Sequence, residues 1–142
     1  MMISTKGRYA LRVMVDLAEN QNGRYIPLKD IAQRQEISEK YLETILPVLI
    51  KNNFLTGLRG KGGGYKLSRT PDTYSVGSIL KLVENSIAPV GCLEGEVNRC
   101  ARAPKCKTLP MWNKLYKMID DYFENISLAD LSKNKEQIDF VI

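Results

Sequence analysis

The sequence predicts a mainly α-helical fold with a small β-hairpin, arranged as a winged helix-turn-helix followed by one long amphipathic helix. Three observations predict it. Apolar residues recur at helical spacing in three successive segments of the first half. A basic, glycine-rich stretch, RGKGGG, follows the third segment and lies between two short strand-like runs. Near the C-terminus, a further segment carries an apolar stripe rich in aromatic residues.

Helix-ending signals separate the first three segments. The stretch STKGRYALRVMVDLAEN begins with Ser4 and Thr5 as N-cap residues and is ended by QNGR. A short second helix, IPLKDIAQRQ, has Pro27 near its first turn. The third segment, SEKYLETILPVLIKNNF, begins with Ser38 as N-cap and leaves four polar residues facing outward: Glu39, Lys40, Glu43 and Thr44. Two helices joined by a tight turn, the second with a polar outer face, are typical of a helix-turn-helix.

The glycine-rich hairpin after the third helix predicts a wing. Its glycines permit positive φ and a tight turn, which places Arg59 and Lys61 at the tip. They do not precede the GK[ST] triplet of a phosphate-binding P-loop. A flexible surface hairpin is the alternative, but the position directly after a helix-turn-helix favours a wing. We therefore expect residues 1–84, which end with the helical segment YSVGSILKLVEN and its N-cap Ser75, to form the DNA-binding domain.

Charge is distributed unevenly along the chain. The net charge is +5; residues 1–69 hold 12 basic and 6 acidic side chains, whereas residues 70–142 hold 9 and 10. This asymmetry suggests a polyanion-binding half, although a solvated basic surface has the same composition. A helix fits the DNA major groove, which is roughly 12 Å wide. Because one such domain makes few contacts, we expect a homodimer on a palindromic operator in double-stranded DNA.

Several classes of protein are excluded by composition. Histidine is absent, so Ser-His-Asp and Cys-His catalysis and imidazole metal ligation are ruled out. No paired acids suggest a catalytic pocket, and we expect no enzyme. No apolar run approaches the roughly 20 residues that span a bilayer, so no membrane association is expected. The N-terminal stretch MMISTKGRYA lacks an apolar signal region, which favours a cytoplasmic protein.

A long helix is predicted from Thr108 to Asn125. Its apolar stripe consists of Leu109, Trp112, Leu115, Tyr116, Ile119, Tyr122 and Phe123. This is more aromatic surface than a small winged helix needs to cover, although a helix folded back on its own core is an alternative. A short capped helix, SLADL, follows, and the two together form a unit at 108–132. The tail, residues 133–142, carries no functional signal.

All three cysteines lie in a segment without helical or strand periodicity, residues 85–107. Cys92, Cys100 and Cys106 have the spacing C-x7-C-x5-C and are accompanied by four basic residues: Arg99, Arg102, Lys105 and Lys107. Nearby cations stabilise thiolates, which are both metal ligands and redox-active groups. The spacing differs from the paired CxxC of a zinc finger, and three cysteines leave an iron–sulfur cluster one ligand short. Metal binding, a thiol or disulfide sensor, and inert cysteines all remain open on spacing alone.

Three motifs together resemble the Rrf2 family of bacterial winged-helix regulators: STKGRYALRVMVDLA, IAQRQEISEKYLETILPVL and LRGKGGGYKLSR. The resemblance covers roughly residues 2–132. It implies a dimeric transcription factor, commonly a repressor, in which the long helix is a dimerisation helix. Family members of the IscR type read bases with a glutamate and an arginine that match Glu43 and Arg59, while Lys40 replaces a family serine. The expected DNA-binding residues are Lys6, Ser38, Glu39, Lys40, Tyr41, Glu43, Thr44, Arg59 and Lys61.

The same resemblance implies an iron–sulfur cluster. Cluster-binding members carry three cysteines in this loop, and Cys92, Cys100 and Cys106 match them in position and order. Where IscR-type proteins have a ligating histidine this chain has Leu109, and where NsrR has a ligating carboxylate it has Arg8. The resemblance therefore allows either a [2Fe–2S] or a [4Fe–4S] cluster. A fourth ligand would come from a carboxylate such as Glu94 or Glu96, from water or from a small thiol.

The sequence thus predicts a cytoplasmic, homodimeric DNA-binding regulator that senses iron–sulfur, iron or redox status through three cysteines. One alternative keeps the DNA-binding dimer but replaces the cluster with thiol oxidation, zinc or a partner protein, as in CymR types. A third possibility is a module that binds no DNA and uses its long helix as a surface for other proteins.

Overall fold

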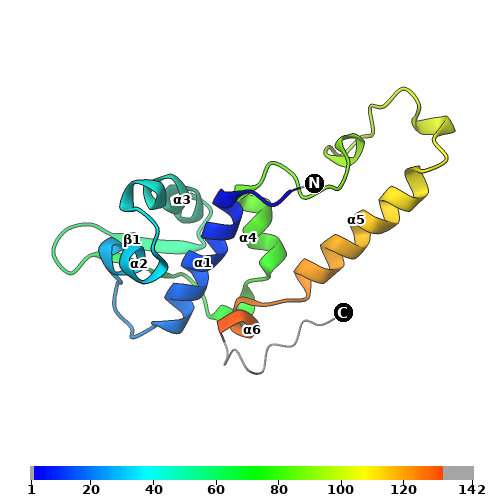
Figure 1. The fold of residues 1–142 in the computed structure, drawn as a ribbon. Coiled ribbons are helices and arrows are strands. Elements are labelled where there is room, and N and C mark those ends of the chain that lie inside the picture. The colour runs from blue at the N-terminus through cyan, green and yellow to red at the C-terminus, as the bar shows by residue number, and fades with distance from the viewer. Residues whose placement is uncertain (1, 133–142) are drawn as a thin grey trace.

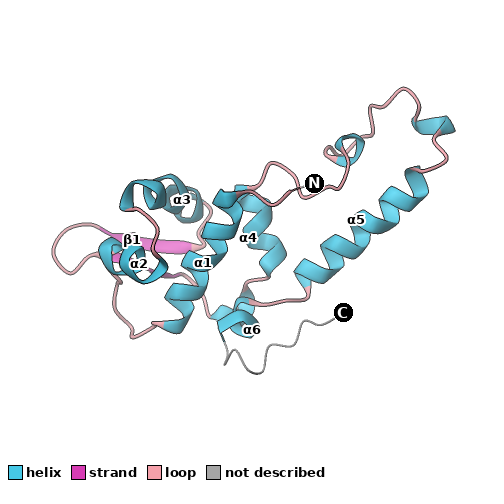
Figure 2. Cartoon of the chain, in the orientation of Figure 1, coloured by secondary structure: helices cyan, strands magenta, loops and turns pink. Residues whose placement is uncertain are grey.

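A computed structural model describes residues 2–132 (Figure 1). The helices are α1 (Thr5–Glu19), α2 (Leu28–Gln35), α3 (Glu39–Lys51), α4 (Val76–Val83), α5 (Leu109–Glu124) and α6 (Leu128–Ser132). Strands β1 (Leu55–Leu58) and β2 (Gly64–Leu67) form an antiparallel hairpin (Figure 2). Three short 3₁₀ turns cover Pro71–Thr73, Gly91–Leu93 and Ala103–Lys105. The predicted mainly α-helical fold with a hairpin wing is confirmed, while the tail, 133–142, lies outside the described residues.

Serine side chains begin three of the helices, as the sequence predicted. The hydroxyls of Ser4, Ser38 and Ser75 accept hydrogen bonds from backbone N–H groups at 3.1, 3.1 and 2.9 Å. Each bond satisfies a donor that the first helical turn leaves without an intrahelical partner. Between α2 and α3, Glu36 adopts the left-handed conformation (φ 54°) that ends α2 and lets α3 begin three residues later.

The hydrophobic core lies between α1, α3, α4 and the base of the hairpin. Helix α1 is central, and its residues Ala10, Val13, Met14 and Leu17 are almost completely buried. They pack with buried residues of the other elements: Ile31, Leu42, Ile45, Leu46, Leu49, Leu55, Leu67, Tyr74, Ile79 and Leu128. Helices α2 and α3 are therefore held at a fixed angle on a single core.

The hairpin is joined to the segment before α2 by an additional pairing. Leu55 lies opposite Leu67 and Leu58 opposite Gly64. On the other edge of β2, Ile26 and Tyr65 exchange two backbone hydrogen bonds of 2.8 Å each. Gly64 permits this approach, because a Cβ there would lie 2.2 Å from the carbonyl oxygen of Ile26. The wing is thus the outer part of a small three-segment sheet.

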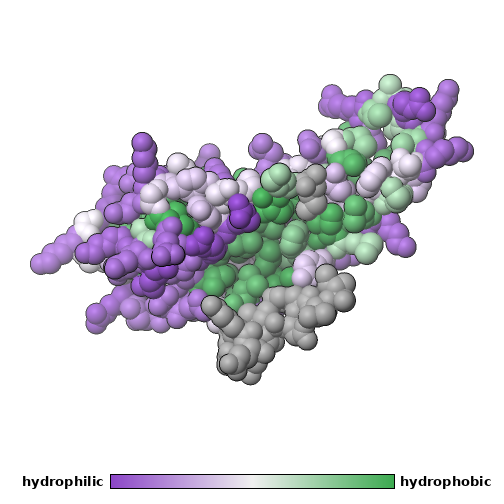
Figure 3. Space-filling model, viewed as in Figure 1, coloured by the Kyte–Doolittle hydropathy of each residue, from purple (hydrophilic) through white to green (hydrophobic). Residues whose placement is uncertain are grey.

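Helix α5 extends away from the winged helix (Figure 1) and has no buried residue in its own chain. One stripe, Tyr116, Ile119 and Phe123, packs against a small cluster around Val76, Leu80 and Ile87. A second stripe is exposed and consists of Met111, Leu115, Met118 and Tyr122. Hydrophobic side chains line the surface between the winged helix and α5 in Figure 3. No helix in the described part of the chain is long and apolar enough to cross a membrane.

Candidate nucleic-acid interface and cysteine loop

The outer face of α3 is polar and open to solvent. Ser38, Glu39, Lys40, Glu43 and Thr44 are all exposed, as expected for side chains that could reach base edges. Tyr41 differs, because it is half-buried and packs edge-on against Tyr9 of α1, with ring centroids 5.3 Å apart. Tyr41 therefore helps to fix α3 on α1 and presents only part of its ring to a ligand.

A buried carboxylate fixes α2 against α1. Asp16 is 1% exposed and accepts two hydrogen bonds from the Arg34 guanidinium, at 3.0 and 2.8 Å, and one from Gln35 at 2.9 Å. The hydrogen bond with Asp16 raises the pKa of Arg34 above its ordinary value. Arg12 also donates to the backbone carbonyl of Gln35. Sequence reasoning missed this network, which orients the first helix of the helix-turn-helix motif.

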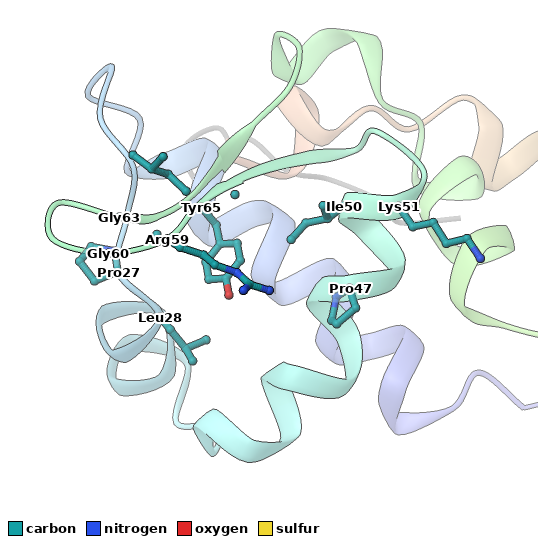
Figure 4. Close-up of a pocket in the computed structure, with 12 residues that line it drawn as sticks. Pro27, Leu28, Pro47, Ile50, Lys51, Arg59, Gly60, Gly63 and Tyr65 are labelled. Atoms are coloured by element: carbon teal, nitrogen blue, oxygen red, sulfur yellow. The ribbon is translucent and has the colours of Figure 1, made fainter.

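A groove separates α3 from the wing (Figure 4). Its volume is about 690 Å³, and its walls include Pro27, Leu28, Pro47, Ile50 and Tyr65. Figure 4 shows Arg59 extending from the wing into this space toward α3. On the α3 side the groove is lined by Pro47, Ile50 and Lys51, so Arg59 lies across from the C-terminal half of the helix whose first turns carry the polar residues.

The wing is fixed at its base and exposed at its tip. The hydroxyl of the buried Tyr74 donates to the Phe54 carbonyl at 2.7 Å and accepts from the backbone N–H groups of Ser68 and Arg69. One side chain thus links the beginning of β1 to the end of β2. Lys61 is exposed at the tip.

Lys6 lies in the first turn of α1 and is half-buried. Among the described residues it forms no hydrogen bond or ion pair with α3 or the wing. Sequence reasoning had grouped it with the DNA-binding residues. Its role in DNA binding stays a prediction.

The cysteine loop contains two short turns and three free thiols. Cys92 lies in the turn Gly91–Leu93 and is half-buried, Cys100 is exposed, and Cys106 is half-buried and follows the turn Ala103–Lys105. Within residues 2–132, no three cysteine, aspartate or glutamate side chains lie close enough to hold one metal ion. Thiolates are the ordinary ligands of iron–sulfur clusters. The donor set suits such a cluster chemically, but in the described arrangement the three sulfur atoms are not gathered.

Cys106 has a distinct environment at the start of α5. Its Sγ lies 3.4 Å from the Thr108 hydroxyl. That hydrogen bond, together with the backbone N–H groups of Thr108 and Leu109 and the charge of Arg102, lowers the pKa of Cys106 below its ordinary value. A thiolate is stabilised at a helix N-terminus in the same way as other anions.

Two carboxylates fasten the elements that flank the loop. Glu84, the residue after α4, accepts hydrogen bonds from the backbone N–H (2.9 Å) and hydroxyl (2.7 Å) of Ser4 at the beginning of α1. Glu124, at the end of α5, accepts from the Ser75 hydroxyl at the beginning of α4, at 3.1 and 2.9 Å. Glycines at positions 7 and 77 leave room for them, because a Cβ would approach the carboxylates to 2.1 and 2.8 Å.

Comparison with known proteins identifies the family. The model of the Rrf2 family, described as an iron-dependent transcriptional regulator, matches residues 3–134. The chain belongs to the Rrf2 family. This Rrf2 protein is accordingly a transcriptional regulator of a DNA-binding family and not an enzyme.

Relatives of this Rrf2 protein share both sequence and fold. The HTH-type transcriptional regulator IscR of Erwinia tasmaniensis is 38% identical over 136 residues, which cover 96% of this chain and 81% of that protein. The structure of T. potens IscR has a TM-score of 0.75 and 34% identity, covering 98% of this chain and 93% of that one. CymR, the global cysteine regulator of B. subtilis, has a TM-score of 0.75 and 31% identity, covering 93% and 96%.

Proposed function

We propose that this Rrf2 protein is a cytoplasmic, homodimeric repressor that binds a palindromic operator with α3 in the major groove and the wing in the adjacent minor groove. The observation that carries the proposal is that α3 has an exposed polar face in its first turns and that Arg59 extends from the wing toward the same helix across one groove. In this reading Glu43 and Lys40 meet base edges, while Ser38, Thr44 and Lys61 contact the backbone. Residues 1–84 then form the DNA-binding unit, 85–107 the sensor loop and 108–132 the dimer unit.

The exposed stripe of α5 supports the homodimer. Met111, Leu115, Met118 and Tyr122 recur at intervals of four, three and four residues, which is the spacing of a helix–helix seam. Their side chains are 37–59% exposed in the single chain. A two-fold arrangement would cover the same stripe on both copies. It would also place two α3 helices on two half-sites.

Replacing Arg59 tests the DNA-binding mode. We expect Arg59→Ala to remove most discrimination between a duplex enriched from a random library by the native protein and a mixed-sequence duplex. A lost specific contact costs about 1–3 kcal/mol, or roughly 5- to 150-fold in relative affinity. Titrations of both duplexes measure the effect, and sedimentation should show an unchanged dimer. Unchanged discrimination would remove Arg59 from the reading role.

We further propose that Cys92, Cys100 and Cys106 hold an iron–sulfur cluster, either [2Fe–2S] or [4Fe–4S]. Support comes from the thiol donor set, the iron-dependent description of the family and the IscR relatives. A bound cluster would supply a centre sensitive to iron and oxidants. The three cysteines would bind as thiolates, and the surrounding basic residues would offset their negative charge: Arg99, Arg102, Lys105 and Lys107.

Anaerobic purification followed by absorption spectroscopy and iron and sulfide analysis tests the cluster. The iron count per chain separates the two cluster types. Serine replacements of each cysteine should lower bound iron, and replacements of Glu94 and Glu96 should reveal whether either is the fourth ligand. A colourless, iron-free protein after anaerobic reconstitution would eliminate the cluster.

One observation favours a second sensing chemistry. The lowered pKa of Cys106 is a property of redox-reactive thiols. In this second reading, oxidation of Cys106 changes DNA affinity without a cluster. Mass spectrometry of peroxide-treated protein, with zinc analysis of the same sample, separates thiol oxidation, zinc and cluster.

A further inference from the structure

The side of the wing that faces away from α3 carries a second cleft. It lies between the hairpin loop and the α1–α2 connection and has a volume of about 550 Å³. Its lining includes Gly23, Arg24, Tyr25, Gly60 and Gly62. Pro27, Gly60 and Gly63 border both this cleft and the groove beside α3, so the two hollows flank the wing. Figure 1 shows the hairpin loop and the α1–α2 connection at the same end of the molecule, away from α5.

Two cations are brought together beside this cleft. Arg24 and Lys66 border one small hollow next to Gly23. The Lys66 ammonium lies 4.6 Å from the centre of the Tyr25 ring, so an aromatic face holds it in place. A hydrogen bond of 2.8 Å from the backbone N–H of Arg24 to the Asn22 side chain shapes the connection. One contact therefore fixes the backbone at Arg24, and the other fixes the side chain of Lys66.

No acidic side chain in the local sequence balances this charge. Residues 20–29 and 44–71 contain no aspartate or glutamate, although they contribute seven lysines and arginines. Within residues 2–132, neither Arg24 nor Lys66 takes part in an ion pair. Neighbouring like charges without counterions favour binding of a polyanion.

The pairing of Ile26 with Tyr65 fixes the position of Arg24 relative to Arg59. Because both backbone hydrogen bonds are 2.8 Å, the α1–α2 connection and the wing form one sheet. Gly60 and Gly62 at the wing tip carry no side chains, and the space around a Cβ built on either of them is open. A DNA strand that passes the wing tip can therefore meet both sides of it.

We propose that Arg24 and Lys66 form an outer phosphate-binding surface that contacts the DNA backbone beyond the minor groove entered by Arg59. This inference rests on the proposed DNA-binding mode and extends its footprint outward from the operator centre. Phosphate contacts fix register and add affinity but do not read sequence. Replacing Arg24 should therefore weaken binding equally for every duplex, in contrast to Arg59.

The salt dependence of binding provides the test. The slope of log K against log[salt] is negative, and each lost phosphate contact reduces its magnitude by about 0.9. Arg24→Ala should therefore make the slope shallower by about 0.9 for each protomer bound. Affinity is measured from about 50 to 200 mM KCl, where one contact accounts for roughly a 3.5-fold change. The probes are the enriched duplex and a mixed-sequence duplex of equal length. Arg24→Lys should restore the native slope.

A matched control and a trimmed duplex complete the design. Lys117→Ala removes an exposed cation from α5 and should leave the slope unchanged. The outer ends of the enriched duplex are then trimmed one base pair at a time. The affinity of the native protein should fall until it equals that of Arg24→Ala, whereas the affinity of Arg24→Ala should not change over the same steps. Equal slopes for native and Arg24→Ala proteins, or equal sensitivity to trimming, would overturn the outer surface. Absence of salt-dependent duplex binding by the native protein would instead overturn the DNA-binding mode.

Discussion

Helices α1 and α5 are similar in length and amphipathic character but differ in what covers them. Helix α1 has 15 residues, six of them buried, whereas α5 has 16 residues and none buried in its own chain. Their N-termini also differ. Ser4 and Glu84 satisfy the first turn of α1, while no side chain caps α5 and the Cys106 thiol lies beside it. An amphipathic helix therefore indicates that a face is to be covered, but not whether the same chain covers it.

Replacement of a buried methionine should have the largest effect. Met14 of α1 is completely buried, so Met14→Ala should lower the free energy of unfolding by about 2–5 kcal/mol. The matched change on α5, Met111→Ala, should change it by less than about 0.5 kcal/mol at concentrations where the chain is monomeric. Denaturant titrations measure both, and similar losses would show that α5 is as much a part of the single-chain core as α1.

Introducing a charge into the exposed stripe should break the proposed dimer and leave the fold intact. Met118 is 59% exposed in the single chain, and Met118→Glu should raise the dimer dissociation constant at least about 30-fold, as for a central interface residue. Asn113→Glu, on another face of α5, is the control. Sedimentation at several concentrations measures association and circular dichroism checks the helices. A dimer that tolerates Met118→Glu would remove this stripe from the interface.

Loss of the buried carboxylate on α1 should destabilise the protein moderately. Asp16→Ala leaves Arg34 and Gln35 without their acceptor, at a cost of about 1–3 kcal/mol. Its counterpart on α5 is Asp121, which pairs with Lys117 at the surface, and Asp121→Ala should destabilise the protein much less because solvent screens that pair. Thermal or denaturant unfolding at neutral pH distinguishes them.

The smallest expected effect concerns the N-terminus of α5. Because the pKa of Cys106 is lowered, its thiolate should persist to lower pH than that of an ordinary cysteine. Thr108→Val removes the main cause, so it should raise that pKa and slow alkylation of Cys106 near neutral pH. Iodoacetamide labelling of chelator-treated protein, followed by mass spectrometry across pH, measures the rate. Labelling of Cys100 serves as the internal reference, and an unchanged Cys106 profile would contradict the role of Thr108.

Local signals predicted most of the fold. Ser4, Ser38 and Ser75 precede apolar periodic segments and cap helices where the sequence placed them. The wing followed from its glycines and from its position after a helix-turn-helix. These features depend on residues close together in the sequence, and local sequence patterns predict such features.

Features that depend on distant contacts could not be predicted. A charged residue in a helix is usually exposed, so the sequence did not indicate that Asp16 is buried and accepts hydrogen bonds from α2. The pairing of Ile26 with Tyr65 joins segments 39 residues apart in the chain. On α5 the sequence suggested one broad stripe, but the structure divides it into a covered and an exposed part and adds Met111 and Met118 to the latter. The cysteine loop lacks periodicity, and its sites stay predictions.

The bridge between Ile26 and Tyr65 has a mechanical consequence. Since the hairpin is bonded to the connection that leads into α2, and Tyr74 closes its base, the wing cannot swing independently of the helices beside it. In the proposed dimer, each winged-helix unit should move as a rigid body. A signal from the cysteine loop would then act on the distance and angle between two such bodies, and its natural observable is the spacing of half-sites that the dimer accepts.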